Sequence, residues 1–293
     1  MIRRLVLLAM LAVTLHARAQ ISVTDDTGNT LRLQTPATRI VALSPHLAET
    51  LYAAGAGGRV VGAVSFSDYP EGAKAIRRVG DAGRIDLEAV AALKPDLILA
   101  WQSGNPAAQV ARLKSLGFPV FVVEPQRVED VASQIERIGV LTGIRAAEAS
   151  AAAYRERLAS LARAQIGKPP VTVFYQIWHS PLITVGGPQI ISDLIRLCGG
   201  SNIFSSLATV APVVTVEAVL AADPELIIAS GSNSGHPAWL ADWRRWPRLT
   251  AVKRDNLRAI DPDLVQRHTP RLLDGAEQLC KILDDARAKR SGF

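Results

Sequence analysis

The histidines and glycine-rich segments of this 293-residue chain are where metal or catalytic chemistry would be expected. His46 and Glu49 could place two metal ligands on one helix face, but a single pair of this kind is a weak signal. The other histidines considered, which have no metal-ligand spacing, are His179, His236 and His268. The segment 231–235 has asparagine in place of the nucleophilic serine of a GxSxG motif, and 55–60 lacks the last glycine of a GxGxxG loop. The sequence therefore predicts a binding protein with no catalytic or metal-ligating set, rather than an enzyme.

The elements that would position a binding site are short apolar strands, which alternate with helices from residue 39 onward. This alternation predicts an α/β fold with mostly parallel sheets, each flanked by helices. Ahead of it, the alternating segments 21–24 and 30–34 flank a turn and predict a hairpin. The expected strands are 39–43, 60–64, 97–100 and 120–123, and the expected helices begin at 44 or 45, 87 and 110.

Residues 86–100 are repeated as residues 215–229, with eight identities in 15 aligned positions. Each copy begins with a helix N-cap residue, Asp86 or Thr215, and has a glutamate two residues later. A proline then ends the helix before a buried strand. We interpret the repeat as two related α/β lobes; chance similarity between two generic helix–strand units is the alternative.

One long helix is predicted between the two copies, over residues 146–166. Its apolar residues recur at helical spacing, and a helix of about 20 residues is roughly 30 Å long. The organisation expected is an N-terminal lobe at 20–143, a linking helix at 144–168 and a C-terminal lobe at 169–293. Because the link contains no Gly/Ser-rich hinge, we expect it to be stiff and the lobes to close little on binding.

The first 19 residues have the pattern of a secretory signal peptide. Arg3 and Arg4 precede an apolar stretch at 5–15, which is too short to span a membrane, and 17–19 has the small-x-small cleavage pattern. Removing this segment, which also contains Arg18, lowers the formal net charge from +6 to +3, too little for a nucleic-acid-binding protein. The full chain has 48% hydrophobic residues, and the mature protein is expected to be folded, soluble and outside the cytoplasm.

The two cysteines, Cys198 and Cys280, have neither CxxC nor zinc-ligand spacing. In an oxidising compartment such a pair is expected to form one disulfide. Two buried free thiols are the alternative.

Four motifs link the chain to a known family: SDYP at 67–70, LKPDL at 93–97, AWQSGN at 100–105 and CGGSNIF at 198–204. With these motifs the chain, from Arg39 to Leu283, resembles the helical-backbone receptors for iron-siderophores, haem and cobalamin that serve ABC importers, and most specifically their cobalamin-binding branch. The resemblance implies a class III periplasmic binding protein fold, in which one rigid helix joins two lobes and the ligand lies between them. It also implies a monomeric periplasmic protein without a prosthetic group. This protein would capture cobalamin or a related corrinoid and deliver it to an inner-membrane ABC permease.

The resemblance further implies roles for individual residues. Tyr69 and Asp263 match pocket residues of the family. Trp101 follows the strand of the first repeat copy, and Trp178 and His179 follow a strand predicted at 171–177. Ligands of parallel sheets bind beyond the carboxyl ends of the strands, where these side chains would lie. Aromatic faces with a few polar groups suit a large, flat corrin ring edged with amides.

The identity of the ligand stays open at this point. Ala82 and Ala211 stand where the cobalamin-binding branch has pocket tryptophans, which removes two stacking surfaces. His268 is also a candidate ligand-binding residue; a hydrogen-bonding or surface role is the interpretation, with axial ligation of cobalt or iron as the alternative. Haem or an iron-siderophore is the rival ligand, and an exported metal-dependent enzyme using His46 and Glu49 is a remote alternative.

Glu88 and Glu217 hold equivalent positions in the repeat and match family glutamates that dock onto permease arginines. One carboxylate on each lobe, held apart by a stiff helix, would form a two-point charge-paired contact. A solvated glutamate favoured by the helix dipole is the alternative for either residue alone.

Overall fold

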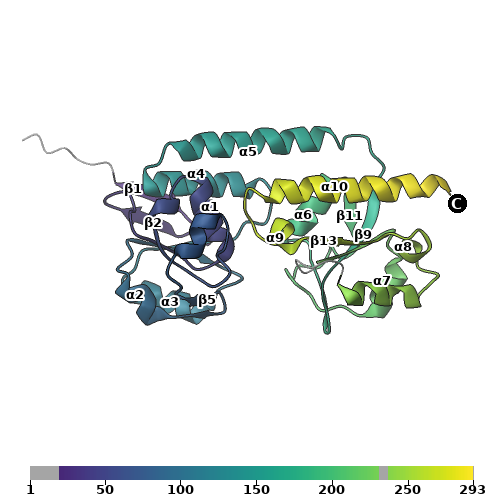
Figure 1. Cartoon of the computed structure of the whole chain (residues 1–293), viewed down its shortest axis with the longest axis horizontal. Helices are drawn as coiled ribbons and strands as arrows, with labels where there is room; N and C mark the ends of the chain where they lie inside the picture. The colour runs from purple at the N-terminus through teal and green to yellow at the C-terminus, as the bar shows by residue number, and fades with distance from the viewer. Residues whose placement is uncertain (1–19, 231–236, 293) are drawn as a thin grey trace, which may run out of the picture.

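The first half of the chain forms a four-stranded parallel sheet with helices on both faces, which we call the N-terminal lobe (Figure 1). The computed structural model describes residues 20–230 and 237–292, so the predicted signal segment, the 231–235 motif and His236 lie outside the described residues. The sheet order is β4-β3-β7-β8. Its strands are β3 (Ile40–Ala42), β4 (Val60–Ala63), β7 (Leu97–Trp101) and β8 (Val120–Val123).

Side-chain alternation along these strands separates the two helical layers. Leu97 and Leu99 of β7 belong to the cluster that packs against α1 and α4, whereas Ile98 and Ala100 belong to the cluster that packs against α2 and α3. The helices are α1 (Pro45–Ala53), α2 (Leu87–Ala92), α3 (Ala107–Ser115) and α4 (Asp130–Thr142). The predicted hairpin is confirmed as the antiparallel pair β1 (Ile21–Thr24) and β2 (Thr30–Leu33). The remaining short elements of this lobe are η1 (Gly57–Arg59), η2 (Glu71–Ala75), β5 (Gly80–Asp81) and β6 (Arg84–Ile85).

The second half of the chain forms the C-terminal lobe around a mostly parallel sheet. Its order is β10-β9-β12-β13, with β11 paired to the first residues of β9; only the β9–β10 pairing is antiparallel. The strands are β9 (Val171–His179), β10 (Leu182–Thr184), β11 (Gly200–Asn202), β12 (Leu226–Ser230) and β13 (Leu257–Ile260). The helices are α6 (Ile190–Leu197), α7 (Val216–Ala222), η3 (Ala238–Arg245), α8 (Thr250–Lys253), α9 (Pro262–Val265), α10 (Leu272–Ala288) and η4 (Lys289–Gly292).

The sequence repeat corresponds to two equivalent helix–strand units, α2–β7 and α7–β12. The Asp86 side chain accepts a hydrogen bond from the Ala89 N–H (2.9 Å), and Thr215 Oγ1 accepts one from the Ala218 N–H (3.2 Å), so both predicted N-caps are confirmed. The equivalence extends to backbone conformation. Lys94 and Asp223, at matching positions after the two helices, both have positive φ values, 47° and 39°.

The predicted long helix is α5 (Ala146–Arg163), which runs along one side of the molecule over α4 of the first lobe and α10 of the second (Figure 1). Its buried face contains Ala147, Ala151 and Tyr154. Arg157 of this helix is half-buried and forms ion pairs with Asp274 and Glu277 of α10 (2.6 and 2.7 Å). The helix is therefore attached to both lobes along its length. Of the helices within 20–230 and 237–292, none combines the length and apolar character needed to cross a membrane.

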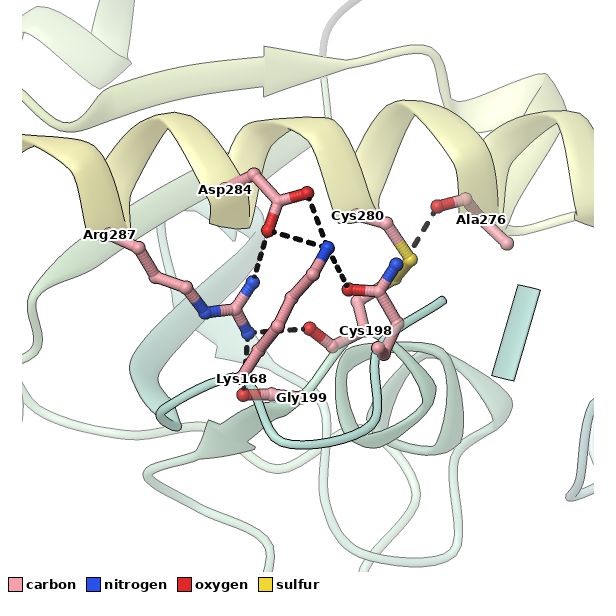
Figure 2. The surroundings of a disulfide bond; sticks show 8 residues. Lys168, Cys198, Gly199, Ala276, Cys280, Asp284 and Arg287 are labelled. Atoms are coloured by element: carbon pink, nitrogen blue, oxygen red, sulfur yellow. Dashed lines mark hydrogen bonds and ion pairs between the residues drawn. A yellow bond between two sulfur atoms is a disulfide. The ribbon is translucent and has the colours of Figure 1, made fainter. Parts of the chain in front are cut away.

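The predicted disulfide is present, joining Cys198 at the end of α6 to Cys280 in α10. Figure 2 shows the ion-pair network beside it: Asp284 accepts hydrogen bonds from Lys168, just beyond α5, and from Arg287. Arg287 also donates to the backbone oxygens of Cys198 and Gly199. This covalent and ionic cluster fixes the end of the α5 connection to the C-terminal lobe.

Candidate functional site

A cavity of about 510 Å³ lies between the lobes and is lined by residues of both. This volume falls in the usual range of small-molecule sites, roughly 300–1,000 Å³. The N-terminal lobe contributes Ser44, Pro45, His46, Phe66, Trp101 and Ser103. The main contributions of the C-terminal lobe are Gln189, Ala211, Asp263, Gln266, Arg267 and His268.

The sheet topology explains why these residues meet. His46 follows β3, Phe66 follows β4 and Trp101 ends β7, while Asp263 lies in α9 directly after β13. The carboxyl ends of parallel strands share one edge of each sheet, and the two edges face the cavity. The site is therefore built from strand ends of both lobes.

The AWQSGN motif positions Trp101. A Cβ atom at position 104 would lie 1.8 Å from Trp101 Cε3, so glycine is required for the ring to lie against this turn. Asn105 Oδ1 accepts a hydrogen bond from the Trp101 N–H (2.7 Å), and Asn105 Nδ2 donates to the backbone oxygens of Leu43 (2.8 Å) and Ala82 (3.0 Å). One buried asparagine thus holds together three loops at the cavity edge.

Three rings from the two lobes form the floor of the cavity. The ring centroids of His46 and His268 are 5.2 Å apart, and Trp101 lies 5.1 Å from the first and 5.7 Å from the second. His46 Nδ1 shares a hydrogen bond with Ser44 Oγ (2.7 Å). Within the described part of the chain, the buried atoms His46 Nε2, Trp101 Nε1 and His268 Nδ1 have no hydrogen-bond partner. Buried polar atoms without partners are unfavourable, which is typical of a site that receives a ligand or water.

Burial keeps both imidazoles neutral. It lowers the pKa of His268 from its ordinary value of 6.5 to about 4. Burial is the main cause that lowers the pKa of His46 well below its ordinary value, and the positive charges of protonated His268 and of Arg267 lower it further. His268 is 4% exposed, so the surface role considered for it is wrong.

Acidification is expected to destabilise the fold through His268. Its pKa is near 6.5 when unfolded and about 4 when folded, so the unfolded state binds more protons between these values. Stability from this group is complete above pH 6.5 and is lost as the pH falls towards 4. Between pH 7 and pH 5, His268 should lower the free energy of unfolding of the wild-type protein by about 2 kcal/mol. The variant His268→Gln should lack this part of the decrease, which urea unfolding at the two pH values measures. The same dependence of stability on pH in the wild type and the variant would contradict this role.

Ion pairs lock the two lobes together beside the cavity. Arg271 of the C-terminal lobe donates two hydrogen bonds to Glu49 of α1 (2.6 and 2.8 Å), and the Glu49 side chain is only 3% exposed. Arg267 pairs with Asp68 across the cleft (2.7 Å) and with Asp263 in its own lobe (3.0 Å). Glu49 is thus engaged by an arginine, which differs from the metal-ligand role considered for it.

The structure places three of the six predicted ligand-binding residues in the cavity lining and three outside it. Trp101, Asp263 and His268 line the cavity. Tyr69 is not a lining residue; it is 44% exposed, with the Arg271 guanidinium 3.9 Å from its ring centroid. Trp178 and His179 are exposed and lie outside the cavity lining.

The position of Trp178 and His179 has a simple structural cause. The strand expected to end at 177 continues to His179 and pairs antiparallel with β10, so Trp178 faces Ile183 and His179 faces Leu182. Both residues therefore belong to a hairpin rather than to a loop at the strand end. The His179 ring stacks on Trp239, with 5.7 Å between centroids.

Several cavity residues were not predicted. Phe66 precedes the SDYP motif, and its place directly after a buried strand was an available signal. Arg267 could have been found from its i,i+4 spacing with Asp263. Gln189 and Gln266 carried no local signal, because their place in the cavity depends on the packing of the two lobes.

Glu88 and Glu217 are exposed residues in the first turns of α2 and α7. These helices lie in different lobes, on the side of the molecule opposite α5 (Figure 1). Neither carboxylate has a cationic partner among residues 20–230 and 237–292. Both are thus available to a partner that contacts the two lobes at once.

The fold and the cavity define a two-lobed ligand-binding protein of class III architecture. It has two α/β lobes, one helix attached to both, and a cavity where the strand ends of the lobes face each other. The chain belongs to the periplasmic binding protein family, whose pattern matches residues 40–264.

Individual relatives agree with this assignment. The vitamin B12-binding protein of Vibrio cholerae serotype O1 is 36% identical over 252 residues, 85% of this chain and 90% of that protein. The vitamin B12-binding protein of Yersinia pestis is 35% identical over 84% of this chain and 86% of that protein. The crystal structure of the periplasmic vitamin B12-binding protein of Vibrio cholerae superposes with a TM-score of 0.79 at 35% identity, covering 86% of this chain and 98% of that one.

Proposed function

We propose that the protein captures cobalamin, or a related corrinoid, in the inter-lobe cavity and delivers it to an ABC importer of the inner membrane. It would act in the periplasm as a monomer, after removal of residues 1–19, and bind its cargo without chemical change. The observation that carries the proposal is the cavity lined by both lobes, in a chain 36% identical to a vitamin B12-binding protein.

The chemistry of the lining supports a corrinoid. The Trp101 ring offers an aromatic contact for a flat macrocycle. Around it, Gln189, Gln266, Asp263 and Arg267 present amide, carboxylate and guanidinium groups that complement the amides at the edge of a corrin ring. Ala211 also lines the cavity, so at this position the protein offers little stacking surface.

Titration of the purified protein with cyanocobalamin and, separately, with haemin tests the proposal. We expect saturable 1:1 binding of cyanocobalamin that is at least about tenfold tighter than binding of haemin. Binding of haemin alone would refute the corrinoid assignment, and binding of neither would refute the whole proposal.

Trp101→Ala is expected to weaken cyanocobalamin binding by about 1–3 kcal/mol, because the ring supplies stacking area on the cavity floor. Trp101→Phe should retain most of the affinity. Trp246→Ala, a change in a partly buried tryptophan that packs in the C-terminal lobe away from the cavity, is the matched control. Isothermal titration calorimetry measures the affinities and circular dichroism checks folding. Equal affinity of wild type and Trp101→Ala would place the ring outside the binding surface.

A further inference from the structure

The rings of His46 and His268 are neighbours although the two residues belong to different lobes. Both residues are buried, 3% and 4% exposed. Their ring centroids are 5.2 Å apart and their planes are inclined by 45°. Two imidazoles that bind one tetrahedral metal ion through nitrogen, at about 2.0–2.1 Å, have ring centroids roughly 5 Å apart. The observed spacing therefore suits a metal ion shared by the two rings.

Ser44 orients the first of these rings. Its hydroxyl oxygen lies 2.7 Å from His46 Nδ1, and with the proton on Nδ1 the imidazole donates this hydrogen bond. Metal-binding histidines typically use the nitrogen that does not touch the metal in this way, which fixes the tautomer and the orientation of the ring. His46 Nε2 then carries the lone pair, and it is buried without a hydrogen-bond partner among residues 20–230 and 237–292. His46 is thus held in the form that a metal ion requires.

The second ring also has a free nitrogen. His268 Nδ1 is buried and has no hydrogen-bond partner in the described part of the chain. Burial lowers the pKa of both imidazoles, so both are neutral at pH 7, and neutral imidazole is the form that binds metal ions. Two buried nitrogens without partners are unfavourable, and a bound metal ion would satisfy both at once.

The charges beside the rings do not oppose a cation. Arg267 is close enough to lower the pKa of His46, but it forms ion pairs with Asp68 (2.7 Å) and Asp263 (3.0 Å). Together the arginine and the two aspartates carry one net negative charge. This charge attracts a divalent cation to the contact between the lobes.

We propose that His46 Nε2 and His268 Nδ1 bind one transition-metal ion, Zn²⁺ or Cu²⁺, where the lobes meet. Imidazole nitrogen is a suitable ligand for both ions. Water would complete the coordination sphere, because no group of three or more His, Cys, Asp and Glu side chains in the described residues is placed to hold a metal. The site goes beyond the proposed function and does not depend on the identity of the transported ligand. Sequence spacing could not reveal it, because one ligand lies in α1 and the other between α9 and α10.

Titration of the untagged, metal-free protein with Zn²⁺ and with Cu²⁺, in the absence of corrinoid, tests the site by calorimetry. We expect 1:1 binding that is tighter for Cu²⁺ than for Zn²⁺. Outer-sphere partners of metal ligands contribute about 10–100-fold to affinity, so Ser44→Ala should weaken binding by about this factor. His46→Ala or His268→Ala should weaken it at least as much. His179→Ala is the matched control, because this exposed histidine lies outside the cavity lining, and both affinities should be unchanged in it.

Electron paramagnetic resonance of the Cu²⁺-loaded wild-type protein gives a second test, which requires no variant to fold. We expect hyperfine coupling from two imidazole nitrogens in the wild type and from one in His268→Gln. Circular dichroism verifies the folding of each variant. Coupling from fewer than two imidazole nitrogens in the wild type would show that the two rings do not share the ion.

The calorimetric outcomes separate this inference from the proposed function. Absence of saturable binding of either ion overturns the metal site. Unchanged affinity in both His46→Ala and His268→Ala, or an equal loss in His179→Ala, shows adventitious binding at the surface and also overturns it. If cyanocobalamin binds and neither ion does, only this inference is wrong. If the ions bind as expected and cyanocobalamin does not, the metal site stands and the corrinoid assignment fails.

Discussion

Replacing Glu88 and Glu217 together by alanine is expected to abolish uptake of cobalamin while leaving the affinity of the protein for cobalamin unchanged. Both carboxylates are exposed on the first turns of equivalent helices in different lobes, and both lie outside the cavity lining. Truncating one partner of a charge pair buried at an interface costs roughly 2–5 kcal/mol. Loss of both pairs would therefore remove most of the binding energy of a two-point contact with the permease.

The matched control is Glu148→Ala combined with Glu156→Ala. These exposed glutamates lie on α5, on the opposite side of the molecule (Figure 1). Uptake is measured in vesicles or cells that contain the permease, and affinity is measured by titration of the soluble protein. Normal uptake by the Glu88/Glu217 double variant would refute the docking role. Loss of cobalamin affinity in that variant would show that the substitutions act on the ligand site instead.

Arg271→Ala is expected to destabilise the folded protein by about 3–5 kcal/mol, because it leaves the Glu49 carboxylate buried without its partner. The pair joins α1 of one lobe to the start of α10 in the other, so its loss should also loosen the contact between lobes. The free energy of unfolding is measured by urea denaturation at pH 7.5.

Two further variants test the explanation. Lys281→Ala removes an exposed ion pair with Asp285 on the same helix and should cost less than about 1 kcal/mol. Combining Arg271→Met with Glu49→Leu removes both charges and should recover most of the lost stability. If Arg271→Ala is no more destabilising than Lys281→Ala, the Glu49–Arg271 pair is not an important contact between the lobes.

The stiffness expected from the α5 sequence has a second source in the structure. Besides the long helix, the Glu49–Arg271 and Asp68–Arg267 pairs and the ring cluster on the cavity floor connect the lobes directly. The lobes are therefore joined both at α5 and beside the cavity. This arrangement would keep Glu88 and Glu217, the proposed docking residues, at a constant separation when the ligand enters.

Much of the fold was predictable from sequence because it depends on short-range patterns. The hairpin at 21–33, the strand–helix alternation, the N-caps Asp86 and Thr215 and the helix α5 all follow from periodicity and capping within a few residues. The repeat predicted two similar units, which the structure matches down to the positive φ values after each helix. The cysteine pair was predictable because the chain contains only two cysteines.

The site was only partly predictable. Trp101 was found because it follows a recognisable strand, but Trp178 was placed at a strand end although β9 continues through it. The Glu49–Arg271 pair joins residues 222 positions apart, and Phe66, Gln189 and Ala211 line one cavity only because the lobes face each other. Hydrophobic periodicity and capping act over a few residues, so the sequence by itself determined the elements and their order. Contacts between distant segments depend on how the lobes pack, so only the tertiary structure decided which side chains share the cavity.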